Sequence, residues 1–381
     1  MKVPGDDSPA LGARGDATSP GICFSQRVAI DRDELRQFID RALGEIGASM
    51  TAALVVVGDK LGLFRALAEA PAPSSPAEVA ERTGVSERYL TEWLAAQAAA
   101  GYVSYDQESG GYFLSAIQAS VFADETSPVS LLGGFQLAVS AARAEPQIVE
   151  AFRSGQGLGW GEHDPGVFAG TERFFRPAYA THLVRSWLPA LEGVEEKLRR
   201  GARVADVGCG RGASTLIMAR AYPETHFNGF DSHPASIAAA RAQAVEAGLA
   251  DRCQFAVASA GDFPGEGFDL VTCFDCLHDM GDPVAAARRV HHSLAGEGTW
   301  MIVEPLAGDS IAENLNPVGR MYYAASTLVC TPASLSEAGG LALGAQAGER
   351  RIRAVVTAGG FRRFRRVAET RFNMVLEARP E

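Results

Sequence analysis

The second half of the sequence predicts an α/β fold, in which a parallel sheet is covered by helices on both faces. From Gly201 onward, short apolar segments alternate with amphipathic ones, and this alternation is typical of such a sheet. The predicted strands are 203–207, 227–231, 253–257, 268–274 and 299–304.

The first half is predicted to be helical and to contain a winged helix. Residues 31–70 have a helical pattern that becomes uniformly apolar near 52–57, and the proline-rich stretch 71–76 ends it. Residues 77–94 have the form of a helix-turn-helix, with Gly84 in the turn and Ser86 as N-cap of the second helix. Residues 101–114 are expected to form two short strands joined by a turn at Gly110 and Gly111, and this small hairpin is the wing.

Charge and composition narrow the classes of function. The chain has 381 residues, with 35 Lys+Arg against 46 Asp+Glu and a net charge of −11. Phosphate binding needs an excess of positive charge, and the second helix carries Glu87 and Glu92 against Arg88, so we expect no nucleic-acid partner. No run of 18 apolar residues and no signal peptide within 1–20 are seen, so we expect no membrane partner and a cytoplasmic protein.

A glycine-rich loop is the strongest local signal. Asp206 lies in a predicted strand, and Gly208, Gly210 and Gly212 follow it directly before a helix. Glycines allow a sharp turn and a close approach of the backbone to a ligand. Asp231 ends the next predicted strand, where a carboxylate can accept both hydroxyls of a ribose. Together these features predict a nucleoside cofactor.

With this D-x-G-x-G-x-G loop, the sequence resembles the class I S-adenosylmethionine-dependent methyltransferases. The resemblance implies a Rossmann-like methyltransferase sheet with an all-α/winged-helix N-terminal domain, and S-adenosyl-L-methionine as cofactor. It implies that Asp206 and the loop hold the methionine part and that Asp231 holds the ribose. Ser259 stands where relatives have an acid near the adenine, and Asp262 is the alternative. The implied cofactor-binding residues are Asp206, Gly208, Cys209, Gly210, Asp231, Ser232, Ser259, Ala260 and Phe274.

A second segment extends the resemblance. Residues 277–282 resemble the LHDW-x-D segment of small-molecule O-methyltransferases, with Met280 in place of the tryptophan. The resemblance implies that His278 is the general base and that Glu304 orients it, with Glu349 as a weaker candidate. The alternative for His278 is a structural role at the start of the following helix. Cys273 and Cys276 have no second ligand pair at zinc-like spacing, so we expect no metal.

The resemblance also implies that a helix at 351–358 and strands at 361–367 and 372–378 close the sheet with an antiparallel hairpin. It further implies a domain plan and a function. We expect a tail at 1–27, a winged-helix dimerisation domain at 28–120, a helical linker and substrate lid at 121–195 and the S-adenosylmethionine-binding methyltransferase domain at 196–381. The expected enzyme is a homodimer that methylates a small molecule, most simply at a hydroxyl oxygen. The candidate substrate residues are Phe175, Tyr179, Tyr322 and Tyr323. The alternatives are a cofactor-binding family member that catalyses a non-methyl reaction, and a winged-helix transcription regulator.

Overall fold

The computed structural model describes residues 30–381, and the predicted tail at 1–27 lies outside them. The chain divides into two units between Gly47 and Ala48, within helix α1 (Arg32–Lys60). A second helix, α2 (Leu63–Ala68), follows after Gly62, whose φ of 68° is left-handed. The single helix predicted over 31–70 was therefore wrong in one respect, because a glycine in this conformation ends α1.

Helix α1 is also the one helix within residues 30–381 that is long and apolar enough, by length and composition alone, to span a membrane. Interface and core helices of soluble proteins pass the same test, so this observation by itself is weak support for a span.

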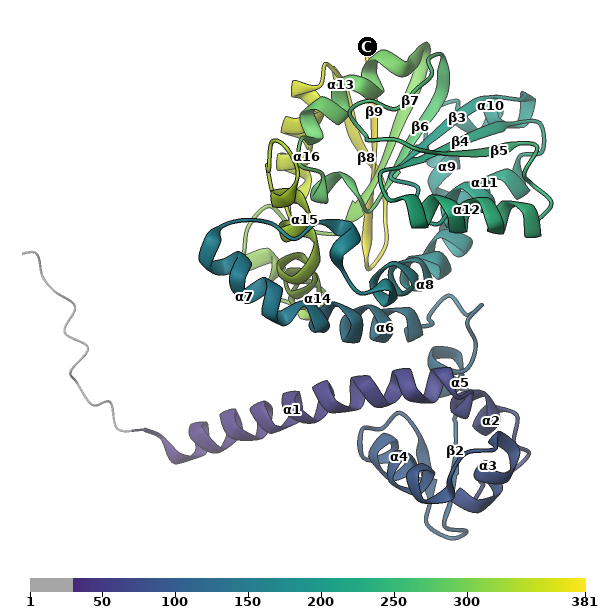
Figure 1. The fold of residues 1–381 in the computed structure, drawn as a ribbon, viewed down its shortest axis with the longest axis vertical. Coiled ribbons are helices and arrows are strands. Elements are labelled where there is room, and N and C mark those ends of the chain that lie inside the picture. The colour runs from purple at the N-terminus through teal and green to yellow at the C-terminus, as the bar shows by residue number, and fades with distance from the viewer. Residues whose placement is uncertain (1–29) are drawn as a thin grey trace, which may run out of the picture. The chain divides into compact units, whose positions relative to one another are not determined.

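The winged-helix segment has the predicted elements (Figure 1). They are α3 (Pro76–Thr83), α4 (Glu87–Ala99), β1 (Ser104–Asp106), β2 (Gly111–Phe113) and α5 (Ala116–Phe122). Ser86 stands at the N-cap position of α4, although its side chain makes no capping hydrogen bond. Ser75 and Glu78 form a capping box at the start of α3, and Gly84 ends it with a φ of 70°. The core of this segment includes Phe64, Trp93 and Leu94.

A run of helices connects the winged helix to the sheet. It consists of α6 (Leu132–Ala141), η1 (Ala142–Ala144), α7 (Glu145–Ser154), η2 (Trp160–Glu162), α8 (Pro165–His182), the π-helical turn η3 (Leu183–Trp187), α9 (Leu188–Ala190) and α10 (Val194–Arg200). Helices α6 and α8 pack closely at Gly170, because glycine has no side chain to separate them. A Cβ at this position would lie 2.6 Å from the backbone nitrogen of Leu137.

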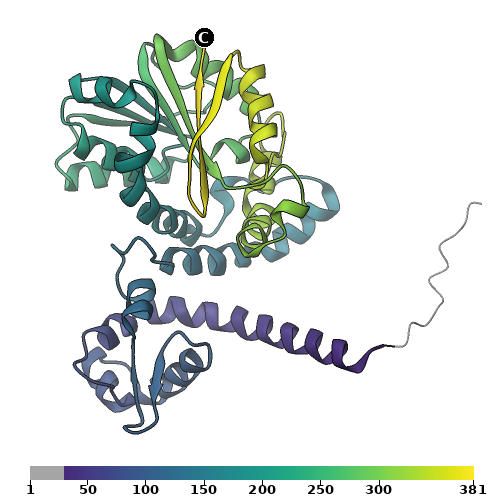
Figure 2. The same cartoon turned by 180° about the vertical axis from the view of Figure 1, so that it is seen from behind.

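The second half forms a seven-stranded sheet in the order β5-β4-β3-β6-β7-β9-β8 (Figures 1 and 2). The strands are β3 (Arg203–Val207), β4 (His226–Asp231), β5 (Cys253–Val257), β6 (Phe268–Phe274), β7 (Leu294–Pro305), β8 (Arg363–Glu369) and β9 (Asn373–Arg379). The first five run parallel, and β9 is antiparallel to both β7 and β8. The prediction of a parallel sheet closed by an antiparallel hairpin is confirmed.

Helices cover both faces of this sheet, and the two faces have separate cores. The remaining helices are α11 (Ala213–Ala221), α12 (Pro234–Glu246), η4 (Leu277–Asp279), α13 (Pro283–Ser293), η5 (Ala312–Asn314), α14 (Pro317–Ala325), the π-helical turn η6 (Ser326–Cys330), α15 (Thr331–Ser336) and α16 (Gly348–Ala358). Helices α10, α11 and α12 pack on the face that carries Val204, and α13 and α16 pack on the face that carries Ala205. Adjacent strand residues point to opposite faces, as the pleat requires.

Candidate functional site

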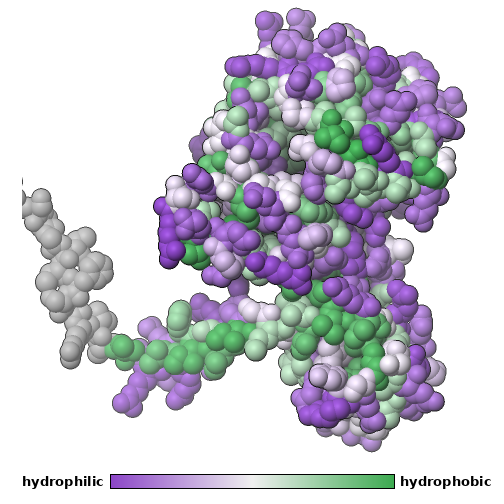
Figure 3. Space-filling model, in the orientation of Figure 1, coloured by the Kyte–Doolittle hydropathy of each residue, from purple (hydrophilic) through white to green (hydrophobic). Residues whose placement is uncertain are grey.

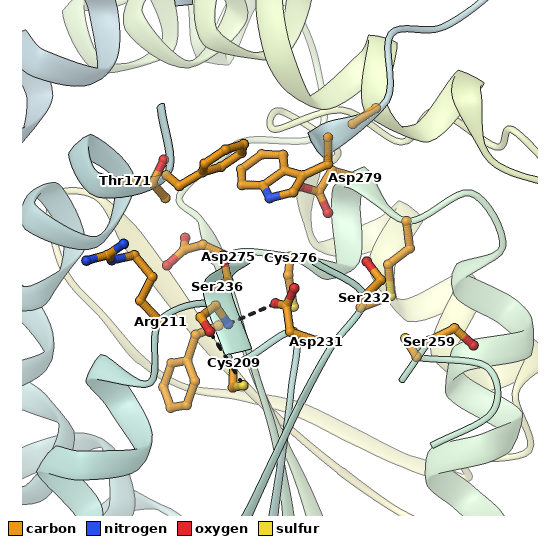
Figure 4. Close-up of a pocket in the computed structure, with 18 of the residues that line it drawn as sticks. Thr171, Cys209, Arg211, Asp231, Ser232, Ser236, Ser259, Asp275, Cys276 and Asp279 are labelled. Atoms are coloured by element: carbon orange, nitrogen blue, oxygen red, sulfur yellow. Dashed lines mark hydrogen bonds between the residues drawn. The ribbon is translucent and has the colours of Figure 1, made fainter. Parts of the chain in front are cut away.

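A cavity of about 400 Å³ lies at the carboxyl ends of β3, β4 and β6. Strands β4 and β5 lie on one side of β3, and β6 and β7 lie on the other, so the strand order switches between β3 and β6. Such a switch point is where open α/β sheets bind ligands. The lining comes from the loops that follow β3, β4, β5 and β6, from α8, and from the region of α15. Figure 4 shows Asp231, Asp275, Cys276 and Asp279 around this cavity.

The glycine loop after β3 is held against the end of β4. The backbone N–H groups of Gly208 and Cys209 donate to the carbonyl oxygen of Phe230 at 2.8 and 3.0 Å. Gly208 has a φ of 72°, and a Cβ there would lie 2.5 Å from the sulfur of Cys276. The loop thus needs glycine at this position for both conformation and space, and it presents its backbone to the cavity.

Asp231 lines the cavity at the end of β4, as predicted. Its Oδ2 accepts the N–H of Gly210 at 2.9 Å, and its Oδ1 accepts the N–H of His233 at 2.8 Å. Burial raises the pKa of Asp231, although both backbone bonds favour the charged form. A carboxylate oxygen has two acceptor sites, so each oxygen keeps one for a ligand.

Asp206 does not line the cavity, so a direct contact between this residue and a ligand, as the resemblance implied, is not what the structure shows. Its carboxylate is fully buried beneath the loop and accepts three hydroxyl groups. Ser214 and Thr215 of α11 donate to Oδ2 at 2.7 and 2.5 Å, and Thr272 of β6 donates to Oδ1 at 2.9 Å. Asp206 therefore ties together the strand before the loop, the helix after it and the neighbouring strand.

The other residues predicted to contact the cofactor all lie on the cavity. These are Gly208, Cys209, Gly210, Asp231, Ser232, Ser259, Ala260 and Phe274. Asp262, the alternative to Ser259, is not part of the lining. Within residues 30–381, no group of three or more His, Cys, Asp or Glu side chains is arranged to hold a metal ion.

The predicted pair of His278 and Glu304 is formed, but it lies outside the cavity lining. His278 Nδ1 and Glu304 Oε2 are 2.6 Å apart, and Glu304 Oε1 accepts the N–H of Leu277 at 2.9 Å. The other ring nitrogen, Nε2, faces the sulfur of Cys330 at 3.3 Å. Burial lowers the pKa of His278, but Glu304 and Cys330 together outweigh burial and raise this pKa well above its usual range.

The weaker candidate for the orienting role, Glu349, is on the surface of α16, where it pairs with Arg353 at 2.7 Å and Arg366 at 3.0 Å. Its assignment to the histidine was wrong, because these arginines occupy its carboxylate.

Asp275 was missed by the sequence reasoning. It follows β6 directly, lines the cavity and has a φ of 51°, which is left-handed and rare for a residue other than glycine. Tyr179 Oη donates to its Oδ2 at 2.7 Å, and Asn373 Nδ2 donates to its Oδ1 at 2.7 Å. Burial and then the charge of Glu304 raise the pKa of Asp275 to about 8. Its position at a strand end was the available signal.

Two of the four predicted substrate residues reach the cavity. Phe175 and Tyr179 of α8 line it, together with Trp160, Phe168 and Thr171, which the sequence did not indicate. Tyr322 is buried behind the lining, where Phe175 packs against it, and donates to the carbonyl oxygen of Phe372 at 2.9 Å, while Tyr323 lines a second cavity beside Asp309 and Arg351. Neither tyrosine is part of this cavity's lining, and their role in substrate binding stays a prediction.

Two family models match the chain. A model described as a methyltransferase domain matches residues 198–345, and one described as an Rv2258c-like winged HTH domain matches residues 49–123. Residues 198–345 are thus similar to a methyltransferase domain. This range contains the glycine loop, Asp231 and the pair of His278 and Glu304, while α8 and Trp160 of η2 line the cavity from outside the matched range.

Curated relatives match part of the chain. A ubiquinone biosynthesis O-methyltransferase of Xanthomonas euvesicatoria pv. vesicatoria is 33% identical over 153 residues, which are 39% of this chain and 60% of that protein. An uncharacterised protein of Synechococcus sp. is 33% identical over 99 residues, which are 25% of this chain and 24% of that protein. The chain thus spans between about a quarter and three fifths of the length of these relatives.

Solved structures match the whole architecture. Human N-acetylserotonin methyltransferase has a TM-score of 0.68 and 19% identity, with 92% of this chain and 99% of that chain covered. This likeness confirms the predicted fold, in which a Rossmann-like methyltransferase sheet follows a helical, winged-helix first half.

Proposed function

We propose that this protein binds S-adenosylmethionine and transfers its methyl group to a hydroxyl oxygen of a small acceptor molecule. The observation that carries the proposal is Asp231, a carboxylate at the edge of the cavity whose two oxygens are locked by backbone N–H groups of Gly210 and His233. This arrangement leaves one acceptor site on each oxygen facing the cavity, which suits the paired hydroxyls of a ribose.

The charges around the cavity fit the proposed cofactor. The lining contains the carboxyl groups of Glu172, Asp231, Asp275, Asp279, Asp282 and Glu337. Burial raises the pKa of Asp275 to about 8 and that of Asp279 to about 7, so the negative charge comes mainly from the other four. The one arginine of the lining, Arg211, is neutralised by Glu172 at 2.5 Å. A site with this charge favours a cation. S-adenosylmethionine supplies a methyl group on a positively charged sulfur, and Asp231, the backbone of Gly208–Gly210, Ser259 and Ala260 are the groups that would hold it.

The acceptor side is aromatic. Trp160, Phe168, Phe175 and Tyr179 line the cavity opposite the glycine loop and belong to η2 and α8. Flat apolar walls suit a planar molecule and exclude water, which competes with the acceptor hydroxyl. We therefore expect a small acceptor with an aromatic or similarly flat ring.

A binding experiment with a matched control tests this proposal. Calorimetric titration with S-adenosylmethionine should give saturable binding to the wild-type chain. Asp231→Ala removes about 2 kcal/mol of charge-assisted hydrogen bonding, so its affinity should fall roughly 30-fold. Asp251→Ala, at an exposed turn before β5, is the control and should bind as the wild type does. Wild-type protein that binds no S-adenosylmethionine would refute the function.

A second measurement tests the transfer itself. Tritiated methyl groups from S-adenosylmethionine should appear in the organic-extractable small molecules of a bacterial lysate. Label that appears only in protein or DNA would contradict a small-molecule acceptor.

We also propose that the protein is a homodimer paired through α1. The apolar side chains along α1 are exposed and recur three or four residues apart, as on one face of a helix (Figure 3). They are Leu35, Phe38, Ile39, Leu43, Ile46, Met50 and Val57. A second copy of α1 would bury this face. The predicted cytoplasmic location stays a prediction.

Sedimentation velocity tests the pairing. Leu43→Asp should convert dimers to monomers at micromolar concentration, because it places a charge in the apolar face. Val245→Asp, at an exposed apolar position on α12, is the control and should remain dimeric. A wild-type monomer at high concentration would contradict the proposal.

A further inference from the structure

Asp275 lies in the cavity lining beside the aromatic wall that we propose contacts the acceptor. It follows the carboxyl end of β6, and its backbone N–H donates to the carbonyl oxygen of Val303 at 2.8 Å, so the start of the turn is tied to β7. The hydroxyl of Tyr179, one of the aromatic wall residues, lies 2.7 Å from its Oδ2. Figure 4 shows Asp275 to the left of Asp231 at the strand ends, on the side of Thr171.

The backbone of Asp275 is held in a conformation that costs energy. Within residues 30–381, only Asp275 and Ala342 have a positive φ without being glycine. A left-handed residue with a side chain costs of order 1 kcal/mol, and such residues concentrate at functional sites. A glycine at this position would relieve the strain but would lose the carboxylate, so the strain points to a use for the side chain.

The two partners of Asp275 suit a group that changes its protonation state. A tyrosine hydroxyl can donate to an ionised carboxylate or accept from a protonated one. The amide of Asn373 donates through Nδ2, and its own Oδ1 has no hydrogen-bond partner among residues 30–381. Rotation of this amide would present Oδ1 to a protonated Asp275. Both protonation states of the carboxyl can therefore be hydrogen-bonded.

His278 lacks the access that Asp275 has. Its ring is buried, it lies outside the cavity lining, and its Nε2 faces the sulfur of Cys330 at 3.3 Å. Its Nδ1 is engaged by Glu304 at 2.6 Å. An acceptor molecule in the cavity would have to displace Cys330 to reach a ring nitrogen, whereas it can contact Asp275 directly.

We propose that Asp275, rather than His278, is the catalytic base that takes the proton from the acceptor hydroxyl, and that Tyr179 and Asn373 position it. The inference rests on the proposed methyl transfer. The acceptor O–H bond breaks, its proton goes to Oδ1 or Oδ2 of Asp275, and the oxygen forms the new bond to the methyl carbon. The electron pair of the broken carbon–sulfur bond stays on sulfur. One positive and one negative charge are consumed, so the step balances without another reactant.

The acidity of Asp275 is consistent with this role. The ionisable groups that face it are Tyr179 on α8, His278 on η4, Glu304 on β7 and Tyr322 on α14. Burial and Glu304 raise its pKa to about 8, while the bond from Tyr179 lowers it. A carboxyl with this pKa is a stronger base than an ordinary aspartate, and its pKa is closer to that of a phenol, about 10.

Turnover measured with tritiated S-adenosylmethionine and the small-molecule fraction of a bacterial lysate tests the role. Asp275→Asn should lower turnover about 10²-fold or more and leave cofactor affinity within about threefold. Asp269→Asn, at the opposite end of β6, is the matched control and should keep wild-type turnover. Turnover of Asp275→Asn near the wild-type rate overturns the proposal. A large loss of cofactor affinity also overturns it, because Asp275 would then be a cofactor ligand.

The pH profile separates a base from a merely structural residue. Wild-type turnover should fall as pH falls through about 8, because only ionised Asp275 accepts a proton. Tyr179→Phe removes the donor that favours ionisation, so the midpoint should move to higher pH. Tyr222→Phe is the control, since this buried hydroxyl has no hydrogen-bond partner among residues 30–381. A midpoint that Tyr179→Phe leaves unchanged, or that His278→Gln moves while Asp275→Asn does not, contradicts the inference.

A readout without turnover keeps the test decisive if no acceptor in the lysate reacts. Infrared difference spectra of the protein alone should contain a protonated-carboxyl band that disappears as pH rises through about 8 and is missing in Asp275→Asn. A spectrum in which Asp275 titrates as an ordinary aspartate overturns the proposal. Failure of the proposed function is distinct, because wild-type protein would then bind no S-adenosylmethionine in calorimetry.

Discussion

Replacing Asp206 should lower the stability of the folded protein more than it lowers the affinity for S-adenosylmethionine. Three hydroxyl groups donate to this buried carboxylate, and a hydrogen bond to a charged group contributes about 1.5–3 kcal/mol. Asp206→Ala loses all three bonds and leaves the hydroxyls of Ser214, Thr215 and Thr272 without their partner. Removing the buried charge itself returns part of this loss. We expect the free energy of unfolding to fall by about 3–5 kcal/mol.

The isosteric variant Asp206→Asn should behave differently. An amide of the same shape can still accept one hydroxyl and donate to the others, so we expect a change within about 1 kcal/mol. Burial raises the pKa of Asp206 from 3.8, so ionisation is less favourable in the folded state than in the unfolded one. The wild type should therefore lose stability relative to Asp206→Asn as pH rises from below 3.8 through the raised pKa.

Chemical denaturation and calorimetry with S-adenosylmethionine check both variants. Asp206→Ala should show the lower unfolding free energy, and Asp206→Asn should bind the cofactor within about tenfold of the wild type. The reasoning is refuted if Asp206→Asn is as stable as the wild type but has lost binding by more than about 100-fold, because the charge of Asp206 would then act on the cofactor directly.

Three further substitutions have definite expected outcomes. Glu304→Gln should lower the unfolding free energy by about 3 kcal/mol near pH 6. The raised pKa of His278 contributes stability that is complete below pH 6.5 and is lost as pH rises through the raised pKa. Denaturation experiments that give the same cost at pH 6 and at high pH would contradict this. Gly208→Ala should weaken S-adenosylmethionine binding at least tenfold by calorimetry, since its Cβ would lie 2.5 Å from the sulfur of Cys276 at a φ of 72°, and unchanged binding would argue against the loop assignment. Gly170→Ala should lower the thermal midpoint by a few degrees, by overpacking of about 1–3 kcal/mol against α6, and an unchanged midpoint would show that the two helices can separate freely.

The fold was largely predictable because its signals are local. Each strand from 203–207 to 268–274 is a short apolar run, and each is followed by a helix or a turn that glycine or proline residues mark in the sequence. The glycine loop and Asp231 were predictable for the same reason, because the loop and the strand end are read within a few residues of each other. The break at Gly62 was missed because a lone glycine within a helical pattern often does not end the helix.

The rest of the site depends on contacts between distant segments. Asp206 sits across from Thr272 only because β3 and β6 are neighbours in the sheet, and the sequence does not state this pairing. Asp275 is held by hydrogen bonds from Tyr179 and Asn373, which lie far from it along the chain on α8 and β9. Tyr322 was assigned to the cavity by type alone, and its hydroxyl turned out to bind backbone.

The strand order also has a consequence for biosynthesis. Strand β9 lies between β7 and β8 in the sheet, yet it follows both in the chain. As the polypeptide leaves the ribosome, the edge of β7 stays unpaired until residues 373–379 have emerged, and open strand edges promote aggregation. The same late segment brings Asn373 to Asp275. A nascent chain can therefore form its glycine loop early, but Asp275 gains its hydrogen bond from Asn373 only when β9 inserts.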